Sequence, residues 1–201
     1  GGSLTRAAMP GEAGMNLLHR RYCRSPEWGA LVEGQLIPWV LGDVELGRHA
    51  LELGSGPGLT TNLLRQRADR LSAVEIDSRD APALAARLAG TNVTVVRADA
   101  TKLPFADGRF SAVVAMTMLH HVASPADQDR LFAEAHRVLE PGGSFCGCDS
   151  RPNLRWRALH VLDTMTVLEP ETLPARLEAV GFTDVETELT PRRVRFRARR
   201  S

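Results

Sequence analysis

The residues best placed to do chemistry in this chain are three glycines and three acidic side chains that follow short apolar runs. They are Glu52, Gly54, Gly56, Gly58, Glu75 and Asp99. The glycines recur at every second position of "LELGSGPG", while the two later acids stand in "AVEIDS" and "VVRADA". A glycine-rich loop lets a ligand lie against bare backbone, and carboxylates accept hydrogen bonds from its donors. The pattern therefore predicts a ligand site where several strands end.

The ligand expected at this loop is a nucleoside without a phosphate. A triphosphate loop ends in Gly-Lys-Ser/Thr, yet Lys102 is the only lysine in the chain. A dinucleotide loop has a third small residue where Leu59 stands, and Glu52 would repel a pyrophosphate. S-adenosylmethionine (SAM) fits better, because it combines an ammonium, a carboxylate, a sulfonium, a ribose diol and an adenine.

Each acid has an expected partner on SAM. Glu52 is expected to accept from the ammonium, directly or through water, and Glu75 from both ribose hydroxyls, with Asp77 as its alternative. Asp99 is expected to accept from the adenine amino group, while the Ala100 amide donates to a ring nitrogen. Structural roles compete with these assignments, because acids also stand at sheet ends, in first helical turns and in loops.

These residues need strands that end side by side, and the sequence alternates strand and helix patterns from residue 49 to 149. Strands are predicted over 49–53, 71–76, 93–98, 110–116 and 144–149, with helices over 59–68, 81–89 and 126–139. Pro141-Gly142-Gly143 is expected to end the last of these helices. Strands that are apolar on both faces and separated by helices are typical of a parallel sheet.

The flanking regions add a helix before this unit and a helix with two strands after it. Ser25 and Pro26 have the types expected at a helix start, which predicts a helix over 25–41. A helix within 170–182 is expected to stop at Gly181, and strands follow over 183–189 and 194–199. The link between these strands is so short that only a hairpin can join them. The predicted fold class is α/β, with a doubly wound, mostly parallel seven-stranded sheet that has one antiparallel strand.

Five blocks of the sequence follow one another in an order typical of a single enzyme family. They are "LELGSGPG" (51–58), "VEID" (74–77), "ADATKLPFADGRF" (98–110), "MLHHV" (118–122) and "RVLEPGGSF" (137–145). Together they resemble the core of class I SAM-dependent methyltransferases, especially the small-molecule group around ubiquinone and menaquinone biosynthesis. The resemblance implies a Rossmann-like methyltransferase fold, SAM as cofactor and S-adenosylhomocysteine as product. It also implies that Ser55, Ile76 and Met116 belong to the cofactor site, and Ser111 stands where the family usually has an acid.

Histidines and one tyrosine are the candidates for handling the methyl acceptor, which is expected to be a small molecule with an oxygen, carbon or nitrogen nucleophile. His120 and His121 are adjacent, and adjacent helical residues point about 100° apart, so one of them is expected to face the cleft. His120 resembles the family's position on the substrate side and is the expected catalytic residue, together with Tyr22. His19, His121 and His160 are expected substrate contacts. Each histidine also has a packing role as its alternative.

The tail "RRVRFRARR" supports a different acceptor class. Its arginines are expected largely on one face of an edge strand, where they would bind the phosphate backbone of RNA. Protection of the sheet edge by charge explains them as well. The rest of the chain has no broad basic patch, so a nucleic-acid acceptor is disfavoured. A SAM-binding protein without catalytic activity is the third hypothesis, because a fold does not fix a function.

Composition is consistent with one reduced, water-soluble domain. The expected organisation over 1–201 is an N-terminal tail or lid (1–24), a capping helix (25–41), the SAM-binding core (49–149) and a C-terminal helix with a strand pair (150–201). The formal net charge is +1, and no run of about 18 apolar residues predicts a membrane span. Three cysteines favour the cytoplasm over a disulfide framework, and no metal site is expected. No pattern indicates an oligomeric state.

Overall fold

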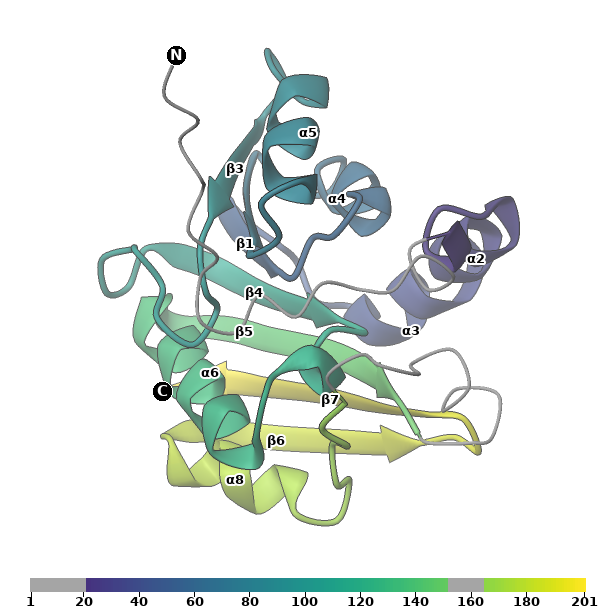
Figure 1. Cartoon of the computed structure of the whole chain (residues 1–201). Helices are drawn as coiled ribbons and strands as arrows, with labels where there is room; N and C mark the ends of the chain where they lie inside the picture. Colours follow the sequence, from purple (N-terminus) through teal and green to yellow (C-terminus); the bar gives the residue numbers. More distant parts are fainter. Residues whose placement is uncertain (1–20, 152–164) are drawn as a thin grey trace, which may run out of the picture.

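The computed structural model describes residues 21–151 and 165–201, and these form a seven-stranded sheet. The strand order is β3-β2-β1-β4-β5-β7-β6, and only β7 runs against its neighbours (Figure 1). The strands are β1 His49–Leu53, β2 Arg70–Glu75, β3 Val93–Arg97, β4 Phe110–Met116, β5 Leu139–Ser150, β6 Phe182–Leu189 and β7 Arg193–Arg200. The predicted fold class, including the single antiparallel strand and the β6–β7 hairpin, is confirmed.

Helices cover both faces of the sheet and enclose two apolar cores. One core lies under α2 Pro26–Leu31, η1 Val32–Leu36, α3 Ile37–Leu41 and α4 Leu59–Leu64, and the other lies under α6 Pro125–Val138 and α8 Leu173–Ala179. The helix α5 Asp80–Arg87 packs on β2 and β3, and the short 3-10 helix η2 Leu119–His121 follows β4. Neighbouring residues Val113 and Val114 belong to opposite cores, which explains why the central strands are apolar on both faces.

The predicted helix over 25–41 is continuous but contains a π-helical segment. Ser25 caps its start by accepting a hydrogen bond from the Trp28 amide at 3.1 Å. The Ile37 amide bonds to the carbonyl of Val32, five residues back. Pro38 follows at once and has no N–H to give to the helix. The wider turn therefore lies where proline interrupts the regular hydrogen-bond ladder.

The predicted end of α6 is wrong by one residue, and the cause lies in the sheet. Leu139 already pairs with Phe110 as the first residue of β5, so Pro141-Gly142-Gly143 lies inside this strand and not at the helix end. The β4–β5 register shifts between Phe110 and Ala112, which accommodates these residues as a bulge. Ser111 sits at the start of β4, where its hydroxyl donates to the Leu46 carbonyl at 2.6 Å and accepts from the His49 amide.

Candidate active site

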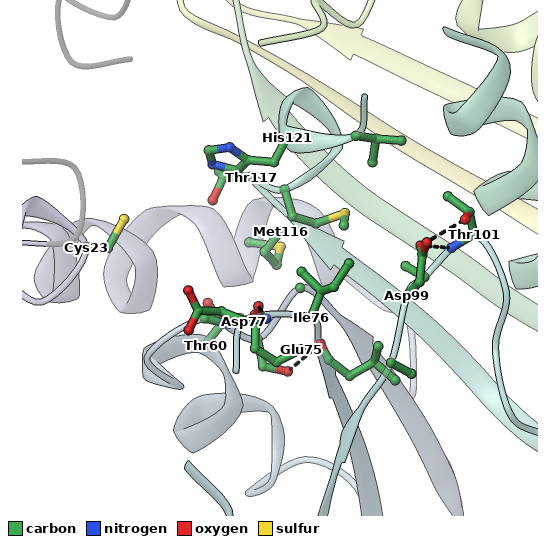
Figure 2. Close-up of a pocket in the computed structure, with 18 of the residues that line it drawn as sticks. Cys23, Thr60, Glu75, Ile76, Asp77, Asp99, Thr101, Met116, Thr117 and His121 are labelled. Carbon is green, nitrogen blue, oxygen red and sulfur yellow. Dashed lines mark hydrogen bonds between the residues drawn. The ribbon is translucent and has the colours of Figure 1, made fainter. Parts of the chain in front are cut away.

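A cavity of about 480 Å³ opens where β1, β2, β3 and β4 end, at the edge where open α/β sheets bind ligands. Its volume suits a small molecule. Most of the predicted cofactor residues line it: Gly54, Ser55, Gly56, Glu75, Ile76, Asp99, Ala100 and Met116. Figure 2 shows Met116 between His121 on one side and the carboxylates of Glu75 and Asp77 on the other.

The three glycines of the loop have different structural roles. All of them have positive φ, at +69° for Gly54, +50° for Gly56 and +83° for Gly58, which favours glycine. Gly54 and Gly56 line the cavity, whereas Gly58 does not. A side chain at Gly58 would overlap Leu84 and Arg87 of α5. The expectation that Gly58 contacts the cofactor is therefore not met, because this glycine lets α4 and α5 approach each other.

Glu75 fastens the glycine loop to the end of β2. Its Oε2 accepts from the Gly56 amide at 2.5 Å and its Oε1 from the Asp77 amide at 2.9 Å. Burial raises the pKa of Glu75, and these two donors act in the opposite direction. Each carboxylate oxygen accepts more than one bond, so the arrangement fits the expected ribose contact. The alternative, Asp77, also lines the cavity, but its Oδ1 accepts from the amides of Arg79 and Asp80 at the start of α5.

Asp99 lies at the opposite side of the cavity from Cys23 (Figure 2). Its Oδ1 accepts from both the amide and the hydroxyl of Thr101, each at 2.8 Å. Both bonds end on the same oxygen, so Oδ2 has no hydrogen-bond partner among the described residues. Ile76 and Met116 add apolar surface. This combination of one carboxylate oxygen and apolar walls fits an adenine ring with its amino group.

Glu52 lies behind the loop and does not line the cavity. Its side chain is 1% exposed, and its Oε2 accepts from the Thr61 hydroxyl of α4 at 2.6 Å. Burial raises the pKa of Glu52 to about 7, while the Thr61 hydrogen bond lowers it and the nearby Glu75 adds a smaller increase. Direct contact between Glu52 and a ligand is therefore not supported, because β1 directs this side chain towards α4.

His120, the expected catalytic residue, is not the histidine of its pair that lines the cavity. His120 is 3% exposed and does not line the cavity, whereas His121 does. The carboxyl group of Asp149 contacts His120, and its Oδ1 lies 2.6 Å from the His120 Nδ1. The sequence reasoning that one of the two faces the cleft is correct, but η2 directs His121 towards it. His121 was expected as a substrate contact, and its position fits that role.

The N-terminal part of the described chain closes one wall of the cavity. Cys23 and Trp28 line the cavity, and neither was predicted. Tyr22 does not line it; this side chain is 40% exposed and its ring lies 5.3 Å from the Trp28 ring. A catalytic role for Tyr22 is therefore not supported. His19 and His160 lie outside the described residues.

Thr117 is a lining residue that sequence reasoning missed. It follows β4 with a φ of +51°, a conformation that costs a β-branched residue about 1–3 kcal/mol. The Thr117 amide donates to the Cys148 carbonyl at 2.8 Å, which holds the turn against β5. No sequence signal marks this position, because threonine is not a residue expected at positive φ. The turn carries the chain from β4 into η2 and so brings His121 to the cavity.

The arginines of β7 share one face, as expected, but the strand is not at the sheet edge. β7 lies between β5 and β6, and its arginines bond to the protein itself. Arg195 donates to the Trp39 carbonyl at 3.0 Å, and Arg197 donates to the carbonyls of Val40 and Trp39 at 2.8 and 3.1 Å. These bonds satisfy carbonyls at the end of α3. The expectation of an arginine face available to RNA is therefore not met at these positions.

Metal ligands, membrane-spanning helices and cysteines are the remaining features of the described residues. No group of three potential metal ligands occurs among these residues, and no helix that they form is long and apolar enough to cross a membrane. Cys23, Cys146 and Cys148 are free thiols. Burial raises the pKa of Cys23 to about 11 and that of the other two to about 12, so all three stay protonated at neutral pH.

Comparison with known proteins gives one consistent result. A family model described as a methyltransferase domain matches residues 51–147. An uncharacterised methyltransferase of Synechocystis is 32% identical over 154 residues, which cover 71% of this chain and 70% of that protein. The demethylmenaquinone methyltransferase of Thermus thermophilus is 37% identical over 101 residues, which cover 48% of this chain and 44% of that protein. The chain spans about half or less of the length of several curated relatives that it matches.

A solved structure supports the fold over nearly the whole chain. A protein of Pyrococcus horikoshii superposes with a TM-score of 0.75 at 20% identity and covers 94% of this chain and 100% of that one. At that identity the likeness concerns the fold. The loop glycines and the lining acids described above lie within residues 51–147, which the family model matches.

Proposed function

Because the chain belongs to the class I SAM-dependent methyltransferases, we propose that it methylates a small molecule bound beside His121. The observation that supports this most strongly is that one cavity extends from Asp99 and the glycine loop to His121. A methyl donor and an acceptor held in one cavity are aligned with each other and shielded from water, which accelerates group transfer. The expected domain organisation, with residues 25–41 as a cap, stays part of this proposal.

The residues at the loop end of the cavity fit SAM by their chemistry. Glu75 and Asp99 offer carboxylate oxygens for the ribose hydroxyls and the adenine amino group. Ser55 and Gly56 have a small side chain or none, so the cofactor can approach their backbone closely. Arg130 also lines the cavity and forms an exposed ion pair with Asp127. When bound, SAM supplies a methyl group on a positively charged sulfur. The protein's own contribution is therefore alignment, exclusion of water and handling of the acceptor's proton.

His121 is the residue that we assign to the acceptor. Among the titratable lining residues, Asp127 is ion-paired and Cys23 is held as a neutral thiol, whereas imidazole exchanges a proton near neutral pH. The Trp28 ring offers a flat apolar surface in the same cavity, which suits an acceptor with an apolar or aromatic part. The name of the Thermus relative, a demethylmenaquinone methyltransferase, makes quinol-like compounds the first acceptors to test.

An RNA acceptor has less support, because Arg195 and Arg197 are used inside the fold. The third hypothesis, SAM binding without catalysis, is separated from the first by turnover alone. The identity of the labelled product therefore tests the RNA alternative, and the absence of any labelled product with SAM still bound indicates the third hypothesis.

The test is a transfer assay with radiolabelled SAM on lysate fractions that contain small molecules, RNA or protein. Label in an organic-extractable small molecule is the expected result, and loss of that label in His121→Ala, with SAM affinity kept within about twofold by calorimetry, supports the assigned role. Asp69→Ala, which removes an exposed acid, serves as the matched control. Label in RNA alone, or SAM binding without any labelled product, would refute the proposal.

A further inference from the structure

A buried carboxylate lies behind the two histidines and takes part in none of the roles assigned so far. Asp149 stands near the end of β5 and is 0% exposed. Its Oδ2 accepts from the His120 amide at 2.9 Å, and its Oδ1 accepts from the Ser150 amide at 2.6 Å. The third contact is the 2.6 Å approach of Oδ1 to the His120 Nδ1. A buried carboxyl group needs such hydrogen-bond partners, and Asp149 has at least one on each of its two oxygens.

The contact with Asp149 determines the state of the His120 ring. A carboxylate only accepts hydrogen bonds, so Nδ1 of His120 carries the proton in this contact. The carboxylate also holds the backbone amide of the same residue, which fixes both ends of His120. The ring of His120 therefore has one tautomer and one orientation.

The His120 ring in turn supports the ring that lines the cavity. The centroids of the His120 and His121 rings are 4.1 Å apart, with an angle of 44° between the planes. His121 has the cavity on one side and this fixed ring on the other. Side chains at functional sites are held to within a fraction of an ångström by such supporting contacts.

We propose that Asp149 and His120 are positioning residues, which hold His121 as the group that takes up the proton of the methyl acceptor. The inference rests on the proposed function and narrows it to nucleophiles that carry a removable proton, namely a hydroxyl, an N–H group or an activated carbon. The bond from the nucleophile to the methyl carbon forms as the methyl–sulfur bond breaks, and its electron pair leaves with sulfur. The proton of the nucleophile passes to a ring nitrogen of His121.

The charges around His121 are compatible with this role. Behind it lies the buried Asp149, and on the cavity side Asp127 and Arg130 of α6 form an ion pair with each other. Glu75, Asp77 and Asp99 line the same cavity, so the charged residues around it are mainly acidic in the part of the chain that the structure describes.

The experiment compares the full-length wild type with Asp149→Asn and with Gln128→Met. Asparagine keeps the size of Asp149 and removes its charge. Gln128 is the matched control, because it is also buried and its Nε2 holds η2 through the Leu119 carbonyl at 3.1 Å without touching Asp149. Imidazole nitrogen NMR reads the tautomer of His120, calorimetry reads SAM affinity, and the labelled acceptor from the transfer assay gives kcat and KM.

We expect His120 to be protonated at Nδ1 in the wild type and at Nε2 in Asp149→Asn. We also expect kcat of Asp149→Asn to fall by about 10–100-fold, with the acceptor KM and the SAM Kd within twofold. An unchanged kcat in Asp149→Asn overturns the inference, and so does an equal loss in Gln128→Met, which would indicate general loosening of η2. Wild-type His120 protonated at Nε2 overturns it even without turnover. Absence of any labelled small molecule with the wild type refutes the proposed function instead.

Discussion

Glu52 should make the stability of this protein fall as the pH rises from about 5 to 8. Its pKa is raised from 4.5 to about 7, mainly by burial, so the folded state holds the proton more tightly than the unfolded chain does. The free energy of unfolding therefore decreases with pH wherever the folded state binds the extra proton. With these two pKa values the contribution of Glu52 falls by roughly 2–3 kcal/mol between pH 5 and pH 8.

Glu52→Gln isolates this contribution, because glutamine resembles the protonated acid and its oxygen still accepts from the Thr61 hydroxyl. Other groups also titrate in this range: burial lowers the pKa of His49 and His136 and raises that of Glu75. The effects of His49 and His136 cancel when the variant is compared with the wild type at each pH, whereas Glu75 interacts with Glu52 and leaves a smaller contribution in the difference. The difference between the two proteins is therefore the informative quantity.

The measurement is urea unfolding of the wild type, Glu52→Gln and the exposed control Glu45→Gln at pH 5, 6, 7 and 8. The stability of Glu52→Gln relative to the wild type should increase by roughly 2–3 kcal/mol across the series, whereas the control should stay within about 0.5 kcal/mol. A constant difference between the wild type and Glu52→Gln would show that Glu52 ionises at an ordinary pH, and the account of its burial would be refuted.

Three further substitutions test the loop, the adenine contact and the helix end. Gly56→Val should abolish SAM binding in calorimetry while circular dichroism stays native-like, because a valine at φ +50° places a side chain at the cavity wall; micromolar affinity in this variant would contradict the loop assignment. Asp99→Ala should weaken SAM binding by about 1–3 kcal/mol in the same assay, and an unchanged Kd would place the adenine elsewhere. Arg197→Gln should lower the free energy of unfolding by about 1–3 kcal/mol through its bonds to α3, while the exposed Arg192→Gln should change it little; equal losses in both would contradict the structural role.

The strands and the cofactor-binding loop are readable from the sequence because their signals are local. The residues that end β1, β2 and β3 follow apolar runs of strand length, so Gly54, Glu75 and Asp99 are correctly brought together by the parallel-sheet pattern alone. Their spacing along the chain is sufficient, since parallel strands joined by helices end at the same edge.

The errors concern residues whose partners are distant in the sequence. The choice between His120 and His121 depends on Asp149, which is 29 residues away. The use of Arg197 depends on a carbonyl 157 residues earlier. Glu52 is the exception, because its partner Thr61 is only nine residues away, and its burial follows from the packing of α4 against β1. Periodicity describes only near neighbours, so it identifies an arginine face but not the helix that this face binds.

The bonds from β7 to α3 also make the two ends of the described chain depend on each other. The helix that carries Trp28, one of the lining residues, ends at carbonyls that accept hydrogen bonds from guanidinium groups more than 150 residues later in the chain. A nascent or truncated chain without residues 193–200 has the glycine loop and the lining acids but lacks these hydrogen bonds to α3. Competence to hold the methyl donor should therefore arise late in biosynthesis, with closure of this long-range contact, and not when the nucleoside-binding segment itself has formed.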